Sequence, residues 1–197
     1  MSYKIITISR QFGSGGRTVG KELADKLGLP CYDQELISMM AEESGFSEEH
    51  VRELGDTPFR NRLFSTRAER ALNSSYLQSA LWNAQEKVIL ELAEQGPCVI
   101  VGRCADRILK DRDDVLRVFI HADEEFRAHR IVEVYGELEG ADPYDRMLEK
   151  DKLREGYYER YTRTQWGDAR NFHLTLNSGE LGLDFCVKLL EGLYKTE

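Results

Sequence analysis

A glycine-rich segment near the start of the chain constrains the fold more than any other feature. Residues 11–18 read Gln-Phe-Gly-Ser-Gly-Gly-Arg-Thr and follow an apolar run, residues 3–8, that is rich in β-branched side chains. Apolar residues then recur at four-residue spacing up to Gly28, which predicts a helix that ends at this glycine. A strand that passes through a glycine loop into a helix is typical of α/β proteins that bind phosphate groups.

The loop carries the residue types that binding of ATP and Mg²⁺ requires. Its glycines let the backbone wrap an anion, so that successive N–H groups and the positive helix end could hold the phosphates. Arg17 would neutralise charge on the transferred group, and the Thr18 hydroxyl would bind Mg²⁺. The predicted ATP-binding residues are Gly13, Ser14, Gly15, Gly16, Arg17 and Thr18. Measured against GxxxxGK followed by Ser or Thr, Gln11 replaces the first glycine and Arg17 the lysine, so a tight turn without a ligand is the alternative.

The rest of the chain alternates strands with helices. Strands are predicted at residues 31–32, 98–101, 115–122 and 173–176. Helices are predicted near residues 76–94, 105–109, 123–134, 142–162 and 181–194. The central strand segments are apolar almost throughout, as expected of parallel strands covered on both faces. The pattern predicts a three-layer α/β fold, in which ligands lie at the carboxyl ends of the strands.

Charge and composition exclude several classes of protein. The net charge of −8, from 35 acidic and 27 basic residues, argues against broad binding of nucleic acid or anionic membranes, so any anion must be held by a local site. The four cysteines lack the spacing of a metal cage, which favours reduced thiols. No apolar run approaches the ~20 residues needed to span a bilayer, and we expect a soluble, cytoplasmic protein.

Several segments, spread over most of the chain, resemble the cytidylate kinase-like family. They are residues 8–17, 99–106, 157–158, 166–167 and 176–178. The resemblance implies the nucleoside monophosphate kinase fold, with a five-stranded parallel sheet, a substrate-binding insert and a mobile lid. It also implies ATP and Mg²⁺ as cofactors and a nucleoside monophosphate, CMP or dCMP, as the acceptor.

On this basis we expect one kinase domain over residues 1–197. Its core would comprise about residues 1–45, 96–136 and 171–197. The substrate-binding insert would occupy about residues 46–95, and the lid about residues 137–165.

The acceptor side is expected at the ends of the second and third strands. Arg103 follows a buried strand, from which a planar guanidinium could bind phosphate through two hydrogen bonds. In cytidylate kinases a similar Gly-Arg-Asp segment places the arginine on the acceptor phosphate and the aspartate near the base. Here Cys104 takes the place of that aspartate, and Asp106 lies two residues further on.

Asp33 matches the family segment that follows the second strand, but its neighbours do not. We assign it to the acceptor site, while a simple cap of the following helix is the favoured reading from sequence alone. The family's acceptor-binding arginine would fall near Met39. Its role would then pass to Arg60, Arg62, Arg67 or Arg70 of the insert.

The helix predicted at residues 142–162 is the candidate lid. Its segment Lys150-Asp151-Lys152-Leu153-Arg154 is similar to the Arg-Asp-Arg-x-Arg lid of cytidylate kinases. The resemblance implies that Lys150, Lys152 and Arg154 act in catalysis with Arg17, and that Asp151 and Arg154 contact the acceptor. The alternative is a solvated basic face. The nearby aromatic residues Tyr157, Tyr158, Tyr161 and Trp166 are more typical of packing than of base stacking.

Three functions therefore remain open. The favoured one is transfer of a phosphoryl group from ATP to a nucleoside monophosphate, with no general base, because a phosphate acceptor is already an anion. The same fold could serve a kinase of another small molecule. It could also belong to a nucleotide-binding regulator with little turnover.

Overall fold

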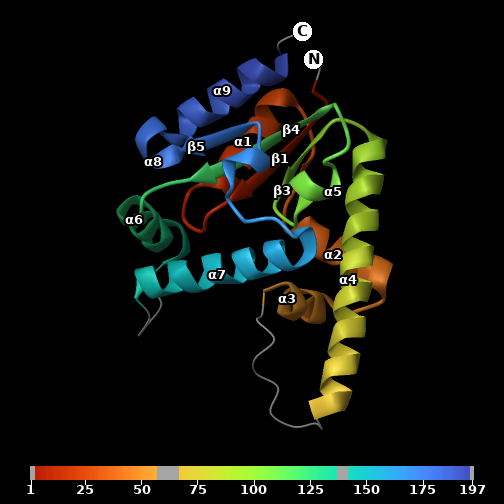
Figure 1. Cartoon of the computed structure of the whole chain (residues 1–197). Coiled ribbons are helices and arrows are strands. Elements are labelled where there is room, and N and C mark those ends of the chain that lie inside the picture. Colours follow the sequence, from red (N-terminus) through yellow and green to blue (C-terminus); the bar gives the residue numbers. More distant parts are fainter. Residues whose placement is uncertain (1–2, 57–66, 137–141, 196–197) are drawn as a thin grey trace.

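The computed structural model describes residues 3–56, 67–136 and 142–195 (Figure 1). The side chains of residues 53–75 are also outside the described part of the chain. The roles predicted for Arg60, Arg62, Arg67 and Arg70 therefore lie outside the described residues.

Five parallel strands form one sheet in the order β2-β3-β1-β4-β5, which confirms the predicted fold class. The strands are β1 (Ile5–Arg10), β2 (Cys31–Tyr32), β3 (Cys98–Val101), β4 (Val115–His121) and β5 (Leu174–Asn177). Ile5 of the central strand lies opposite Cys98 on one side and Val115 on the other. Because the strands are parallel and share this register, their carboxyl ends meet at one edge of the sheet.

The helices in the described part of the chain are α1 (Gly16–Leu27), α2 (Glu35–Ser44), α3 (Glu48–Asp56), α4 (Arg67–Gln95), α5 (Ala105–Ile108), α6 (Glu124–Tyr135), α7 (Pro143–Thr162), α8 (Ser178–Leu181) and α9 (Leu183–Lys195), with a 3₁₀ turn at Ala169–Asn171. Most predicted helices are present, but α4 begins at Arg67 and not near residue 76. The last predicted helix, near residues 181–194, corresponds to α9, and Gly182, with a φ of 77° that an α-helix cannot accommodate, separates it from the short helix α8.

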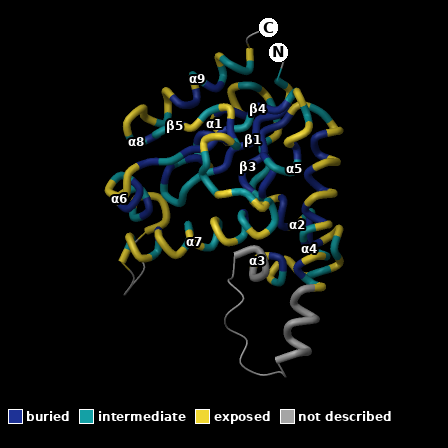
Figure 2. Tube along the Cα trace, viewed as in Figure 1, coloured by how far each residue is buried: buried dark blue, intermediate teal, exposed yellow. Residues whose placement is uncertain are grey.

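Helices cover both faces of the sheet, which gives the predicted three layers (Figure 1). On one face, Leu23 of α1 and Leu190 of α9 pack against Ile8 of β1 and against the neighbouring strands. On the opposite face, Leu36 of α2 and Ile89 of α4 cover the sheet together with α5. Figure 2 shows the sheet as the most continuously buried part of the chain.

Two further features shape the carboxyl edge of the sheet. Helices α2, α3 and α4 enclose a small apolar cluster that includes Met40, Val51 and Leu81. Helix α7 runs below this edge and packs against α6 and α3 (Figure 1). Among the helices in the described part of the chain, none has the length and apolar character needed to cross a bilayer.

Candidate active site

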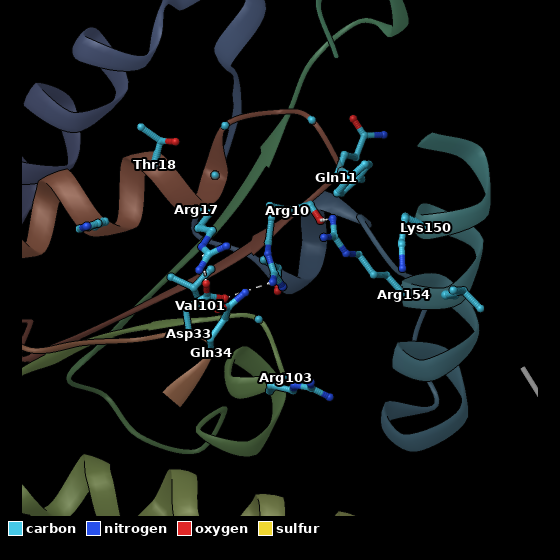
Figure 3. A pocket seen from close by; sticks show the side chains of 18 of the residues that line it. Arg10, Gln11, Arg17, Thr18, Asp33, Gln34, Val101, Arg103, Lys150 and Arg154 are labelled. Carbon is cyan, nitrogen blue, oxygen red and sulfur yellow. Dashed lines mark hydrogen bonds and ion pairs between the residues drawn. The ribbon is translucent and has the colours of Figure 1, made fainter. Parts of the chain in front are cut away.

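A cavity of about 700 Å³ opens at the carboxyl ends of β1, β2 and β3, where the α/β fold is expected to bind ligands. Figure 3 shows side chains from β1, α1 and α7 pointing into this space. The described lining includes eight basic side chains: Arg10, Arg17, Lys21, Arg52, Arg103, Arg130, Lys150 and Arg154. It includes three acidic ones: Glu22, Asp25 and Asp33. A chain with a net charge of −8 thus gathers positive charge at one place, which favours an anionic ligand.

The glycine loop forms one end of the cavity. Gly13 and Gly15 have φ values of +81° and +78°, and α1 begins at Gly16. A Cβ atom at Gly13 would lie 2.7 Å from the carbonyl oxygen of Arg127, and one at Gly16 would lie 2.6 Å from the Cβ of Arg10. These glycines are therefore required by contacts within the protein, in addition to any approach of a phosphate.

The two hydroxyl groups of the loop make protein contacts. Ser14 is fully buried, and its hydroxyl donates to the carbonyl oxygens of Gln11, at 2.9 Å, and Ile120, at 3.1 Å. Its side chain thus closes the loop and does not line the cavity. Thr18 does line the cavity, where its Oγ1 accepts a hydrogen bond of 2.7 Å from Nη2 of Arg130 on α6.

Asp33 lies between two arginines and does not cap α2. Its Oδ2 lies 2.6 Å from Nε of Arg17, and its Oδ1 lies 3.6 Å from Nη2 of Arg10 (Figure 3). The residue at the N-cap of α2 is Gln34, which makes no side-chain capping bond. The capping interpretation was wrong, because the carboxylate is directed to the cations at the end of β1 and the start of α1.

Arg10 is a residue of the site that the sequence analysis did not assign. Burial is the main cause that lowers the pKa of its guanidinium to about 9; the neighbouring Arg154 and Arg103 also lower this pKa, and Asp33 raises it. An arginine keeps its charge at neutral pH, so Arg10 is a cation with too little negative charge around it. A charged residue at the end of an otherwise buried apolar strand was the signal available in the sequence.

A strained turn presents Arg103 to the cavity. Gly102, Arg103 and Cys104 have successive φ values of 80°, 54° and 55°, which place two residues with side chains in the left-handed region. Each such residue costs roughly 1–2 kcal/mol. The turn is held by Gln85 of α4, a fully buried side chain whose Nε2 donates to the carbonyl oxygen of Arg103 at 2.9 Å. Strain of this kind is often found at functional sites.

Asp106 does not line the cavity and is therefore not placed to contact a nucleobase. Its carboxylate is buried, with Oδ1 accepting from the Ser9 hydroxyl at 3.0 Å and Oδ2 accepting from the Tyr158 hydroxyl at 2.7 Å. Cys104 does line the cavity, and burial raises the pKa of its thiol well above the ordinary value. The group next to Arg103 is therefore a neutral thiol.

On α7, the predicted acceptor residue Asp151 has a different role. Its Oδ1 accepts from the backbone N–H of Phe12 at 2.7 Å, and its Oδ2 accepts from the buried guanidinium of Arg127. Both oxygens are engaged, and Asp151 does not line the cavity. It ties α7 to the glycine loop and to α6.

The cations of α7 divide into two groups. Lys150 and Arg154 line the cavity, and Nη1 of Arg154 donates to the carbonyl oxygen of Arg10 at 3.1 Å. The Arg154 guanidinium also lies 5.4 Å from the centre of the Phe12 ring. Lys152 is exposed and is not among the lining residues, because it lies on another side of the helix. Its predicted catalytic role is not supported by this placement.

The aromatic residues of α7 pack largely as predicted. Tyr161 stacks on Trp82 of α4 with ring centres 4.6 Å apart, and Tyr157 lies 4.8 Å from Tyr161. The Tyr157 hydroxyl donates to Oε1 of Gln85 at 2.9 Å. The contacts of Tyr157 and Tyr161 join α7 to α4. Trp166, which follows α7, packs edge-on against Phe119 of β4 while it lines the cavity.

The described residues offer a limited site for Mg²⁺. They contain no group of three or more His, Cys, Asp or Glu side chains that could hold a metal ion. Mg²⁺ in phosphotransfer sites is bound by one or two protein oxygens together with phosphates and water, so a large cluster is not required. Thr18 Oγ1 fits that pattern, provided that Arg130 leaves the hydroxyl.

The comparisons with known proteins agree with this fold. An uncharacterized protein from Eubacterium ventriosum is 26% identical, with a TM-score of 0.73, and the match covers 98% of this chain and 99% of that one. A shikimate kinase from Bacteroides thetaiotaomicron is 18% identical, with a TM-score of 0.56 and 98% of both chains covered. A gluconokinase from Sinorhizobium meliloti is 17% identical, with a TM-score of 0.51 and 98% of both chains covered. No curated protein matches the chain.

The shikimate kinase and the gluconokinase share the fold of this chain, which is that of the phosphate-loop kinases. A family model extends the comparison to the sequence, because it matches residues 5–180. The match includes the glycine loop, the Arg103 turn and the whole of α7. The chain therefore belongs to the cytidylate kinase-like family.

Proposed function

We propose that this protein transfers the terminal phosphoryl group of ATP to a nucleoside monophosphate, CMP or dCMP in particular. The observation that carries the proposal is the cavity in which a glycine loop and a strand-end arginine, Arg103, face the same space. The excess of cations around it suits two phosphate-bearing substrates. Membership of the kinase-like family supports phosphotransfer but leaves the acceptor open.

At the loop end, Gly13, Gly15 and Gly16 would let backbone N–H groups and the start of α1 approach the phosphates of ATP. Arg17 would exchange its ion pair with Asp33 for a phosphate oxygen, since a guanidinium binds both anions in the same way. Mg²⁺ would be held by Thr18 with phosphates and water, and would neutralise charge on the transferred group when bound.

At the other side of the cavity, Arg103 would bind the acceptor phosphate. The acceptor needs no general base, because its phosphate is an anion at neutral pH. Lys150 and Arg154 of α7 would stabilise charge that spreads over the transferred group, and α7 would act as the lid. We infer that Asp151 contributes by holding this helix on the glycine loop.

Release of ADP from ATP, measured with CMP, dCMP, UMP, AMP and GMP, tests the proposal. Arg103→Ala removes a charged hydrogen-bonding partner worth roughly 1.5–3 kcal/mol, so the KM of the preferred acceptor should rise at least about tenfold while the Kd of ATP stays close to wild type. Absence of turnover with all five monophosphates, despite tight binding of ATP, would contradict the proposal.

A separate prediction, about the choice of base, follows from the neutral thiol of Cys104. A thiol accepts a hydrogen bond weakly, so it cannot hold the exocyclic amine of cytosine as a carboxylate would. We expect the preference for CMP over UMP to be small. Exclusive use of CMP would refute this claim and leave the kinase proposal intact.

One observation favours a second candidate, a kinase whose acceptor is a hydroxyl group. Asp33 is a carboxylate that faces the cavity at the end of β2, where it could accept the proton of an alcohol. The fold is also shared with proteins named shikimate kinase and gluconokinase, whose names indicate acceptors other than nucleotides.

The Asp33→Asn variant separates the two candidates. Loss of a general base lowers turnover by about 10²–10⁴-fold. With a phosphate acceptor the same change should reduce kcat by less than about tenfold, because the carboxylate then only orients Arg17 and Arg10. A regulator with little turnover would release no ADP with either class of acceptor.

A further inference from the structure

Arg10, the last residue of β1, lies beside Arg103 without having been assigned to either substrate. We propose that Arg10 is the second arginine of the acceptor site and binds the acceptor's phosphate together with Arg103. The inference rests on the proposed function and deepens it, because it names the residue that replaces the acceptor-binding arginine absent from α2. At that position Met39 packs against the apolar core between the sheet and the helices α2, α4 and α5.

The turn after β3 is shaped around the Arg10 side chain. A Cβ atom at Gly102 would overlap Nη1 of Arg10, so the guanidinium occupies space that exists only because residue 102 is glycine. Gly102 immediately precedes Arg103, and its φ of 80° begins the left-handed turn. The two arginines are thereby held at adjacent strand ends, since β1 pairs directly with β3.

The charges around Arg10 are unbalanced. Its one ion-pair partner among the described residues is Asp33, at 3.6 Å, and that carboxylate is closer to Arg17, at 2.6 Å. Arg154 brings another guanidinium to the carbonyl oxygen of Arg10. Arg103 makes no ion pair within the described part of the chain. An anion with several oxygens, such as a phosphate, would compensate Arg10 and Arg103 together.

The direction of Arg10 places it on the acceptor side. In Figure 3 its side chain points from β1 toward Asp33 and Arg103, whereas Thr18 lies on the far side of Arg17, on α1. The side chain is 21% exposed, so it is mostly buried yet still reaches the cavity that it lines. Partial burial strengthens a charge-assisted hydrogen bond, because solvent screens it less.

Steady-state kinetics of three variants test the inference. Arg10→Met keeps the aliphatic stem and removes the charge, so the KM of the acceptor should rise at least about tenfold with the Kd of ATP within about twofold. Arg10→Lys keeps the charge without the planar fork and should give a smaller rise. Gly102→Ala should raise the KM while Arg10 is still present, because the new methyl group displaces the guanidinium.

Arg112→Met is the matched control. Arg112 is 28% exposed, bonds Asp114 through its Nε at 2.9 Å and does not line the cavity. The Arg112→Met variant loses an ion pair whose burial is similar to that of Arg10 with Asp33, so its kinetics should match wild type even if its Tm falls. The double variant Arg10→Met/Gly102→Ala should be no worse than the poorer single variant, because both changes remove the same contact.

The outcomes separate this inference from the proposed function. If wild type uses a monophosphate but Arg10→Met and Gly102→Ala leave the acceptor KM unchanged, or raise the Kd of ATP equally, the role of Arg10 is refuted and the kinase stands. If wild type uses no monophosphate, the proposed function fails. Binding of inorganic phosphate, measured by calorimetry, then tests whether Arg10 belongs to an anion site. Weaker binding in Arg10→Met than in Arg112→Met would support an anion site at Arg10, and equal binding would overturn it.

Discussion

At residues 13–16 of the glycine loop the one side chain, that of Ser14, is directed into the protein, whereas the arginines at the ends of β1 and β3 are directed into the cavity. Ser14 bonds two carbonyl oxygens, and a side chain at Gly16 would collide with Arg10. Arg10 and Arg103, in contrast, line the cavity with few carboxylates around them. A ligand at residues 13–16 would be bound by backbone N–H groups, and a ligand at the strand ends by guanidinium groups.

This difference has a physical consequence for mutation. Substitutions at the loop should act on the free energy of unfolding and on ATP affinity together, because the same backbone serves both. Substitutions at the strand ends should act on the acceptor alone, because they leave the packing of the sheet intact. The following predictions test this distinction, from the largest expected effect to the smallest.

The contact between α7 and the loop should show the largest effect. Asp151→Ala leaves the guanidinium of Arg127, whose side chain is 5% exposed, without its carboxylate, and removes the acceptor of the Phe12 N–H. Breaking a buried pair in this way costs about 3–5 kcal/mol. Urea denaturation would measure it, and a loss below about 1 kcal/mol would show that the helix is not held by this pair. Arg127→Met in the same chain should restore part of the stability.

Gly16→Val should come next. Its Cβ would meet the Cβ atoms of Arg10 and Ile120, and overpacking of this kind costs about 1–3 kcal/mol. Affinity for Mg·ATP, measured by calorimetry, should be lost at the same time. Gly156→Ala is the control, because no atom lies near its Cβ position in α7 and the change should stabilise the helix by roughly 0.5–1 kcal/mol. Unchanged ATP affinity in folded Gly16→Val would refute the phosphate-loop assignment.

Arg154→Ala should affect turnover with little effect on the fold. If Arg154 stabilises charge mainly in the transition state, kcat should fall at least about tenfold, equivalent to ~1.4 kcal/mol, while the Kd of ATP changes less than about threefold. Lys110→Ala, at an exposed position outside the cavity, serves as the control. Equal rates for Arg154→Ala and wild type would indicate that the basic residues of α7 form a solvated face with no role in catalysis.

The smallest effect is expected at Gln85, which touches no substrate in the proposed arrangement. Gln85→Met removes the hydrogen bond to the Arg103 carbonyl oxygen and should raise the acceptor KM by about three- to tenfold, corresponding to ~0.5–1.5 kcal/mol. Tyr157→Phe removes only the bond to Gln85 Oε1 and should have a smaller effect in the same direction. An effect on kcat alone would argue against a role in positioning Arg103.

Much of the fold could be predicted from local patterns. The apolar run before the loop, the four-residue spacing after it and Gly28 were sufficient to place β1 and α1. The continuous apolar segments were sufficient to identify β3 and β4 as buried parallel strands. These signals are local, because periodicity and helix ends depend on residues close together in sequence.

The candidate site could be predicted only in part. The loop and Arg103 were found from their positions after strands. Arg10 was missed, and Asp33 and Asp151 have protein partners that the sequence did not indicate. The reason is distance along the chain: Arg154 and Arg10 are 144 residues apart, and Phe12 and Asp151 are 139 residues apart. No local pattern reveals which of several charged residues will meet.

Local patterns and family resemblance were sufficient to predict the succession of strands and helices along the chain, the glycine loop after β1 and membership of the family. The tertiary structure decided which charged side chains face the cavity. It directs Asp151 into the loop and leaves Lys152 in solvent, although both lie in one short motif. The physical reason is that a side chain's direction depends on the phase of its helix or strand against its neighbours, and that phase is set by packing between segments far apart in the chain.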